Sequence, residues 1–432
     1  MPHHHHPDGP DHVHADEPML ALEAVQRLVL ERCQPLETLE LPLAESLGAV
    51  LAEDVVATED IPPFPNTAMD GFAVRSGDTA GAPVELEVVG VLPAGSEPPP
   101  EPLGPGQALQ IMTGAPMPPG ADAVAIVERT EPAGEGRVRI LDEVTASANI
   151  RRAGSDLRSG ALALAAGSVL TPAQIGMLAS VGKVSAPVFR RPVVGVMSTG
   201  DELVQDGAPL RPGQIRDSNR ATLLALVRRD GYPAVDLGPV ADTRAAVSEA
   251  LERGRASCDV VLSSGGVSKG EFDFVKVVLD ELASRNGGES FELAVAIRPA
   301  KPLALAWLPR GDRPGATAFF GLPGNPVSAV VSYHVVALPA LRQMAGQEPA
   351  VRRTVPAVAG ERLSPSRDGR LNLLRTVARI DETGHLVVRS AGGQQSHQLS
   401  GLAAANSLTL VPAGDPVEEG ERVAVLLLDG LS

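Results

Sequence analysis

The chain has 432 residues, more than a single hydrophobic core usually supports, so we expect three or four domains. Hydrophobic residues make up 44% of the sequence but aromatic residues only 3%, which predicts aliphatic cores and argues against stacking of nucleic-acid bases on aromatic side chains. The 37 Lys and Arg residues against 53 Asp and Glu residues give a net charge of -16, so the chain repels phosphate backbones and no nucleic-acid partner is expected.

Three further features narrow the class of protein. Cys33 and Cys258, the two cysteines, lie far apart and predict neither a disulfide framework nor a zinc site, as expected in the reducing cytoplasm. No apolar run approaches the length of about 18 residues that a membrane span needs, and no signal peptide is visible, so no membrane partner is expected. The His-rich segment 1–18 has the composition of a disordered tail, either a natural metal-scavenging tail or an added tag.

Residues 19–33 carry apolar side chains at helical spacing and predict a helix. From 72 to about 148 short strands alternate with Pro/Gly clusters, which predicts a β insert. Residues 149–182 return to helical character, with Thr171 and Pro172 as the N-cap and first helical residue. Helical segments on both sides of the insert predict one discontinuous domain. The expected boundaries are 19–56 with 149–190 for this helical or linker domain, and 57–148 for the inserted β domain.

Strands alternate with helices from residue 191 onward. This order predicts a doubly wound, mostly parallel α/β domain with right-handed crossovers over 191–345. After Gly346 short strands return and predict a β-barrel-like C-terminal domain over 346–432. The expected fold class is therefore a multidomain combination of α/β and β domains.

Two polar turns are predicted at the carboxyl ends of strands in the α/β domain, where doubly wound sheets bind ligands. One turn runs from Ser198 to Glu202, and the other runs from Ser263 to Gly270 with Asp273 beyond it. Glycines let backbone N–H groups approach an anion, and carboxylates beside an anion make sense if a divalent cation bridges them to phosphate oxygens. Each turn alone could simply cap a helix, but two at equivalent places of one sheet favour a ligand site. The candidate binding residues are Ser198, Thr199, Gly200, Ser264, Gly265 and Gly266.

The segment AIRPAKP places Arg298 and Lys301 beside prolines that fix their directions. It predicts a rigid anion clamp, although an edge strand with solvated cations has the same pattern. The following GLPGNP loop precedes a helix that begins at Pro326, which predicts a further anion site. Its candidate binding residues are Pro323, Asn325 and Pro326. No Ser/His/Asp or Cys/His nucleophile pattern stands out, and His334 lies in an apolar helical run typical of a structural residue.

PPFPNTAMDGFAVR, residues 62–75, is a proline-rich loop that presents one carboxylate, Asp70. Pro62, Pro63 and Pro65 exclude a helix and cannot donate to a sheet ladder, whereas residues 72–74 predict the start of a strand. A simple connection with a solvated acid has the same composition.

Seven motifs in order resemble the signatures of one family: PPFPNTAMDGFAVR, QIMTGAPMPPGADAV, NIRRAGSD, VMSTGDEL, VLSSGGVSKGEFDF, AIRPAKP and GLPGNPVSA. They resemble the MoeA family of molybdopterin molybdenumtransferases, to which the E domain of gephyrin belongs, over about residues 19–430. The resemblance implies a four-domain chain that forms an elongated homodimer. It also implies insertion of molybdate into adenylylated molybdopterin (molybdopterin-AMP) with release of AMP and with Mg²⁺. A separate adenylyltransferase would supply the substrate, because no adenylylating domain is expected in this chain.

The resemblance also assigns roles by position. The catalytic acids it implies are Asp70, Asp156, Glu202, Asp242 and Asp273, with Asp70, Glu202 and Asp273 as metal ligands. It implies substrate binding by Thr113, and oxyanion binding by Arg298, Lys301, Arg375 and Ser396.

The sequence departs from the family pattern at four positions, with Pro65 where aspartate is frequent, Arg298 where lysine is usual, Ala300 where glycine is usual, and Ala294 where some relatives have a basic residue. Three alternatives stay open: a gephyrin-like scaffold without catalysis, another nucleotide-dependent transferase, and a homologue that inserts tungstate.

Overall fold

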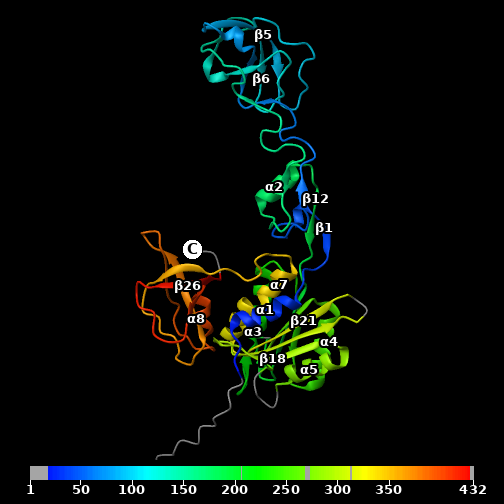
Figure 1. The fold of residues 1–432 in the computed structure, drawn as a ribbon, viewed down its shortest axis with the longest axis vertical. Coiled ribbons are helices and arrows are strands. Elements are labelled where there is room, and N and C mark those ends of the chain that lie inside the picture. The colour runs from blue at the N-terminus through cyan, green and yellow to red at the C-terminus, as the bar shows by residue number, and fades with distance from the viewer. Residues whose placement is uncertain (1–17, 206, 268–272, 312–313, 429–432) are drawn as a thin grey trace, which may run out of the picture. The chain divides into compact units, whose positions relative to one another are not determined.

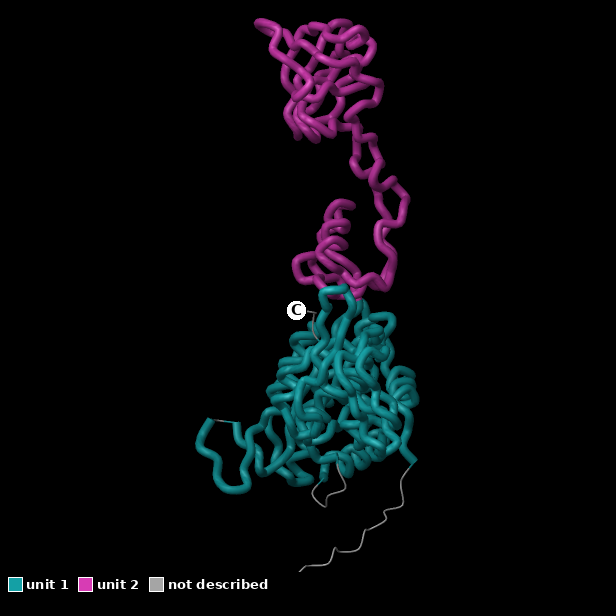
Figure 2. The backbone as a smooth tube through the Cα atoms, turned by 90° about the vertical axis from the view of Figure 1, so that its left-hand side faces the viewer, with its two compact units in different colours: residues 1–39, 189–432 teal, residues 40–188 magenta. Residues whose placement is uncertain are grey.

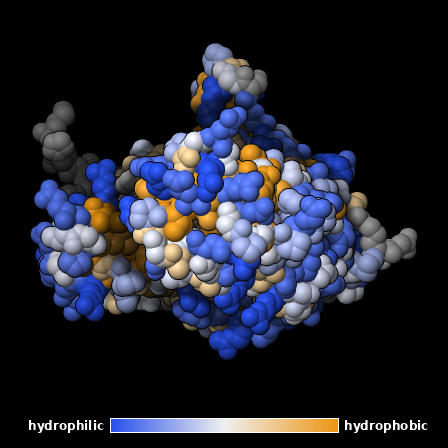
Figure 3. All heavy atoms as spheres, turned by 90° about the horizontal axis from the view of Figure 1, so that it is seen from above, coloured by the Kyte–Doolittle hydropathy of each residue, from blue (hydrophilic) through white to orange (hydrophobic). Residues whose placement is uncertain are grey.

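The computed structural model describes residues 18–205, 207–267, 273–311 and 314–428. The predicted tail, except for its last residue, and Ser268, Lys269 and Gly270 of the second polar turn lie outside these ranges. The chain divides into two compact units, one of residues 1–39 and 189–432 and one of residues 40–188 (Figure 2). Hydrophilic residues cover most of the surface seen in Figure 3, and apolar residues gather there in smaller groups. Within the described ranges, no helix combines the length and apolarity needed to cross a membrane.

The larger unit contains the predicted α/β domain, whose described residues form a six-stranded sheet in the order β16-β13-β17-β21-β20-β18. Its strands are β13 (Val194–Thr199), β16 (Ala234–Val240), β17 (Val260–Ser264), β18 (Glu289–Ala294), β20 (Pro302–Pro309) and β21 (Ala316–Leu322). The first four strands in this order are parallel, and β20 and β18 each run antiparallel to their neighbour. The prediction of a mostly parallel, doubly wound sheet is confirmed.

Helices cover both faces of this sheet. They are α1 (Leu22–Arg32), α3 (Ser218–Arg229), α4 (Arg244–Ser257), α5 (Phe274–Asn286), α6 (Pro326–Ser332), the π-helix η4 (Tyr333–Ala337) and α7 (Leu338–Met344). Side chains alternate between two cores along each strand. Val260 and Leu262 pack in the core that contains α1, α3, α6 and α7, whereas Val261 packs in the core that contains α4 and α5. Figure 1 shows α4 and α5 together beside the sheet, away from α1 and α7.

The C-terminal part of the larger unit is a closed barrel, as predicted. Its elements are β22 (Val355–Ala359), β23 (Leu371–Ile380), β24 (Leu386–Ser390), α8 (Leu399–Ala404), β25 (Ser407–Val411) and β26 (Arg422–Leu427). The strands follow the order β23-β24-β22-β26-β25, and pairing of β25 with β23 closes the ring. The short strand β19 (Ile297–Arg298), just before β20 in the chain, pairs in parallel with β23. Because of this pairing, the predicted anion clamp is attached to the barrel.

The smaller unit contains the predicted β insert as a sheet in the order β7-β4-β6-β5-β9-β8. Its elements are η1 (Leu43–Glu45), β2 (Val55–Val56), β3 (Asn66–Thr67), β4 (Gly71–Val74), η2 (Ser76–Thr79), β5 (Val84–Leu92), β6 (Gln107–Ile111), β7 (Ala123–Ile126), η3 (Val127–Arg129), β8 (Thr130–Pro132), β9 (Arg137–Ile140), β10 (Ile150–Arg151), β11 (Leu162–Leu164) and α2 (Pro172–Ser180). The chain passes between the units within β1 (Thr38–Pro42) and β12 (Ser185–Phe189).

The helical prediction for residues 149–182 is only partly right. Helix α2 begins at Pro172 with Thr171 as its N-cap, and the Thr171 N–H donates to the side-chain oxygen of Gln174 at 3.3 Å. The residues before it form short strands instead, because β10 pairs with β3 and β11 with β2. Cross-strand partners distant in the sequence override the local helical pattern here.

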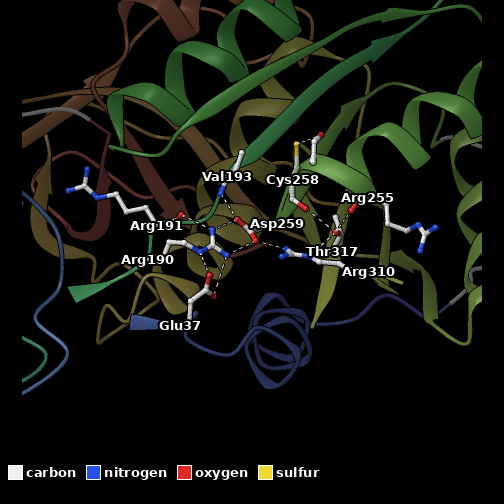
Figure 4. Close-up of polar contacts among 10 residues, drawn as sticks. Glu37, Arg190, Arg191, Val193, Arg255, Cys258, Asp259, Arg310 and Thr317 are labelled. Atoms are coloured by element: carbon white, nitrogen blue, oxygen red, sulfur yellow. Dashed lines mark hydrogen bonds and ion pairs between the residues drawn. The ribbon is translucent and has the colours of Figure 1, made fainter. Parts of the chain in front are cut away.

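A buried carboxylate, Asp259, ties the chain's return from β12 to the start of the parallel sheet (Figure 4). Arg190 donates to both of its oxygens at 2.7 and 2.9 Å, and Arg310 forms an ion pair with it at 2.5 Å. The Val193 N–H donates to the same carboxylate at 2.7 Å. Burial would raise the pKa of Asp259, but the hydrogen bonds from Arg190 and Val193 and the charge of Arg310 lower it instead. Since the Asp259 side chain is only 4% exposed, its two arginines offset an otherwise unpaired buried charge.

We predict that Asp259→Ala lowers the free energy of unfolding of the larger unit by about 3–5 kcal/mol, because it leaves Arg190 and Arg310 without their shared partner. Trp307, the single tryptophan, lies in β20 and reports unfolding of this unit by fluorescence in urea. Glu249→Ala removes an exposed ion pair with Arg253 and should change stability by less than about 1 kcal/mol.

The same pair of proteins gives a pH test. A carboxyl whose pKa is lowered by folding contributes its full stability above its unfolded pKa of about 4, and loses it as the pH falls below that value. The difference between wild type and Asp259→Ala should therefore shrink in acid. Equal stability of wild type and variant at neutral pH would contradict the role given to Asp259.

Candidate active site

A cavity of 830 Å³ in the larger unit lies at the carboxyl ends of β13 and β17 and extends to residues 394–397 of the barrel. It brings together most of the predicted site residues of this unit. Those that line it are Ser198, Thr199, Glu202, Asp242, Ser264, Gly265, Gly266, Asp273, Arg298, Lys301, Pro323, Asn325, Pro326 and Ser396. Gly200 and Arg375 are not among the lining residues. Residues of the α/β domain and of the barrel thus meet in one pocket of a single chain.

The turn after β13 is shaped by a buried hydroxyl and a folded-back acid. The Ser198 hydroxyl donates to Asp217 at 2.6 Å, which anchors the strand end to the N-cap of α3. Gly200 has a φ of 148°, and a Cβ there would lie 2.6 Å from the carboxylate of Glu202. Glycine is therefore required for Glu202 to fold over the turn.

The turn after β17 packs directly against the first turn. Gly265 has a φ of 97°, and a Cβ there would lie 2.9 Å from the carbonyl oxygen of Thr199. The Gly265 N–H donates to the carbonyl oxygen of Leu322 at 3.1 Å, which ties this turn to the loop 321–326. Because side chains are excluded at this junction, backbone groups of the turn border the cavity.

Asn219 also links the turn after β17 to the loop 321–326, and it was not predicted from the sequence. Its amide donates to the Ser264 hydroxyl and to the Gly324 carbonyl, both at 2.7 Å. It lines the cavity together with Asp217. The signal was the polar triplet Asp217-Ser218-Asn219 at the start of α3, which resembles an ordinary helix cap.

One side of the cavity is acidic, with Glu202, Asp242 and Asp273. The pKa of Asp242 is raised by burial and then by the negative charges of Asp201 and Glu202, with a smaller contribution from Asp273. Mutual repulsion of this kind is relieved by a bound cation, and carboxylate oxygens are the ligands that Mg²⁺ prefers. The donor set therefore fits a divalent cation in charge and chemistry. Within the described ranges, however, no three His, Cys, Asp or Glu side chains are arranged to hold an ion.

The other side of the cavity is basic, with Arg298, Lys301 and Arg370. Arg298 donates to Asp368 at 2.7 Å and to the Ser366 hydroxyl at 2.9 Å. Between the two predicted cations, Ala300 is buried and has a φ of 89°, in the region that favours glycine. The backbone turn at position 300 therefore has a conformation that glycine would adopt with less strain than alanine.

Arg375 is fully buried and does not line the cavity, but it supports the loop of residues 394–397 that does. Its guanidinium donates to the carbonyl oxygens of Gly393 at 2.6 Å and Gln395 at 3.2 Å. Burial lowers its pKa. The Ser396 carbonyl accepts from the Val327 N–H at 3.1 Å, so the loop that Arg375 holds is also tied to α6. The contacts in the structure make Arg375 a support of this loop, and its direct binding of an oxyanion stays a prediction.

Three predicted site residues, Asp70, Thr113 and Asp156, lie in the smaller unit and are exposed. Asp70 accepts hydrogen bonds at 2.6 Å from both the hydroxyl and the backbone N–H of Thr113, and these bonds lower its pKa. The two residues are thus brought together as one group. Asp156 donates through its backbone N–H to the Ile61 carbonyl oxygen at 3.0 Å.

Comparison with known proteins matches nearly the whole chain. Residues 20–182 match the MoeA N-terminal region (domain I and II), residues 195–343 a probable molybdopterin binding domain, and residues 357–428 the MoeA C-terminal region (domain IV). The chain is 36% identical over 410 residues to a molybdopterin molybdenumtransferase of Haemophilus influenzae, covering 94% of this chain and 98% of that protein. It is 38% identical over 399 residues to molybdopterin molybdenumtransferase 2 of Mycobacterium tuberculosis, covering 91% and 96%.

The chain belongs to the MoeA family. A crystal structure of a molybdopterin biosynthesis MoeA protein from Pyrococcus horikosii is similar throughout, with a TM-score of 0.76 and 30% sequence identity over 96% of this chain and 100% of that one. The family models, the two relatives and the solved structure all confirm the resemblance inferred from the motifs. In this MoeA chain, the described cavity lies within the region matched as a probable molybdopterin binding domain and its junction with the C-terminal region.

We predict that Ala300→Gly stabilises this MoeA chain by roughly 0.5–1 kcal/mol. The reason is that a positive φ costs alanine about 1–2 kcal/mol, whereas the added freedom of the unfolded glycine costs about 0.5–1 kcal/mol. Urea unfolding followed by Trp307 fluorescence measures the change. Ala250→Gly, at a fully buried position inside α4, is the control and should destabilise by at least about 1 kcal/mol. A loss of stability in both variants would show that Ala300 is not strained.

Proposed function

We propose that this protein is a molybdopterin molybdenumtransferase that inserts molybdate into adenylylated molybdopterin and releases AMP, in the biosynthesis of the molybdenum cofactor. The observation that carries the proposal is one cavity that joins an acidic side, with Glu202, Asp242 and Asp273, to a basic side, with Arg298 and Lys301, in a chain of this family. A protein with a net charge of -16 needs such local cations to bind an anionic substrate.

Different parts of the cavity fit the two substrates, adenylylated molybdopterin and molybdate. The backbone N–H of Gly266, in the turn after β17, and the loop 321–326 that Asn219 braces fit the phosphates of the adenylylated substrate. Lys301 and Ser396 suit molybdate, a tetrahedral dianion, because an ammonium and a hydroxyl both donate to oxyanion oxygens. The dithiolene chemistry belongs to the substrate, and the protein supplies placement and charge.

We propose that Glu202 and Asp273, with Asp70, hold Mg²⁺ during the reaction. The bound ion would supply positive charge against the phosphates whose linkage to AMP is cleaved. Glu202, Asp273 and Asp70 would hold the ion at the phosphate end of the substrate, and Asp242 adds to the negative field of Glu202 and Asp273. Thr113 keeps Asp70 ionised through its two hydrogen bonds. Asp156 has no contact in this structure that assigns it a step, and its catalytic role rests on the family resemblance.

We predict that wild-type protein releases AMP from adenylylated molybdopterin when both molybdate and Mg²⁺ are present. Glu202→Gln and Asp273→Asn should each slow this release by roughly 100-fold or more, because an amide replaces the charged oxygen that the phosphate end depends on. Glu249→Gln is a control on the surface of α4 and should have wild-type rates. A parallel reaction with tungstate measures which oxyanion is preferred. Wild-type rates in both acid variants would contradict the proposed site, and absence of AMP release from wild type would contradict the proposed activity.

We also propose that the protein acts in the cytoplasm as a homodimer and receives its substrate from a separate adenylyltransferase. The homodimer rests on the family resemblance and on the division of the predicted acids between the two units, with Asp70 in one and Glu202 and Asp273 in the other. The α/β domain and the barrel supply residues of one cavity within a single chain, so only Asp70 calls for a second chain.

We predict that inactive Asp70→Asn and Asp273→Asn proteins recover activity when their subunits are mixed and exchanged. If each active site combines Asp70 of one chain with Asp273 of another, a hybrid dimer contains one intact site, as two-fold symmetry allows. Differently tagged subunits, purified as hybrids, should reach roughly half of the wild-type AMP release per dimer. Confirmed hybrids that stay inactive, or a fully active monomer, would contradict the shared site.

A further inference from the structure

A carboxylate that is not itself a lining residue pairs with both arginines on the basic side of the cavity. Asp368 accepts from Arg298 at 2.7 Å and from Arg370 at 2.5 Å. Among the described residues, Lys301 has no carboxylate within ion-pair distance. Two of the three cations are therefore already paired within the protein, and the third is available to an incoming anion.

The fold holds Asp368 in this place independently of the ion pairs. The parallel pairing of β19 with β23 sets Arg298 opposite Asn372, four residues beyond Asp368. Asn372 is buried, accepts from the Ser366 N–H at 3.0 Å and donates to the Arg370 carbonyl oxygen at 2.9 Å. These bonds fix both ends of the short loop that contains Asp368. A carboxylate built into the loop in this way differs from a chance surface pair between long side chains.

Hydrogen bonding from Arg370, and then from Arg298, also holds the pKa of Asp368 below its usual value, although its partial burial acts in the opposite direction. A negative charge thus lies beside Arg298 and Arg370 at neutral pH.

We propose that Asp368 is an internal counter-ion that positions the guanidinium groups of Arg298 and Arg370 and weakens oxyanion binding in the cavity. The proposal rests on the proposed function for the identity of the oxyanion. In this account Lys301 provides the main attraction for a tetrahedral dianion, and Asp368 keeps the two arginines from adding their full charge. A weaker attraction lets the oxyanion bind in the cavity and still leave it, as a transferase requires.

Asp368 contacts two arginines that line the cavity, so removing its negative charge increases the affinity for an anion bound there, and the gain in free energy scales with the charge of the anion. Asp368→Asn keeps the shape and one acceptor oxygen for the arginines while it removes the charge. We expect molybdate, with two charges, to bind about tenfold tighter to this variant. Perrhenate, a tetrahedral oxyanion with one charge, should bind only about threefold tighter.

Equilibrium dialysis of molybdate and of perrhenate against the full-length protein measures both affinities directly. Asp368→Glu restores the charge on a longer side chain and should stay within about twofold of wild type. Asp415→Asn, an exposed acid of the same domain, changes the net charge equally and should leave both affinities unchanged. A thermal melt of each variant checks that the fold is intact.

In the AMP-release assay, Asp368→Asn should lower the half-saturating molybdate concentration by a similar factor. Unchanged or weaker molybdate binding in Asp368→Asn, an equal gain for molybdate and perrhenate, or the same behaviour in Asp368→Glu would overturn the inference. Molybdate binding that responds to Asp368 as expected, without any AMP release by wild type, would support the counter-ion and contradict the proposed transferase activity.

Discussion

The buried ion pairs of Asp259 are the constraint on which the cavity depends. Asp259 and Val193 exchange hydrogen bonds immediately before β17 and β13 begin, and Arg190 brings the returning chain to the same point. The two strands then run in parallel with Ser198 opposite Ser264 at their far ends. The network thus lies at the start of both strands, whereas both polar turns lie at their carboxyl ends. An error of one residue in this register would turn Ser198 away from Asp217 and separate the two turns.

The cavity is lined by both acidic and basic side chains, which come from different parts of the fold. The acids come from the turns of the α/β sheet, whereas the basic side is built where β19 joins the barrel strand β23. Arg375 contributes from beneath by holding the loop that carries Ser396. An acidic protein can in this way offer a cationic surface to an oxyanion and an anionic surface to a cation within a single cavity.

The sequence predicted much of this arrangement because glycine turns and proline-fixed cations are local patterns. The ends of β13 and β17, the helix beginning at Pro326 and the barrel all follow from such patterns. Asn219 could not be found in the same way, because its partners Ser264 and Gly324 are 45 and 105 residues away in the sequence. The pairing of Asp368 with Arg298 was equally hidden, because it spans 70 residues. The region 149–170 was misjudged for a related reason, since its strands form only through pairing with residues near 55 and 67. The positive φ of Ala300 became visible only in the backbone itself.

The proposed function depends above all on molybdate binding in the cavity between the sheet and the barrel. The most direct test is a crystal structure of the protein with molybdate, in which anomalous diffraction at the molybdenum absorption edge locates the metal. We predict a peak within hydrogen-bonding distance of Lys301 and Ser396, and its loss in Lys301→Ala crystals grown under the same conditions. A peak outside this cavity, or one unaffected by Lys301→Ala, would contradict this binding site.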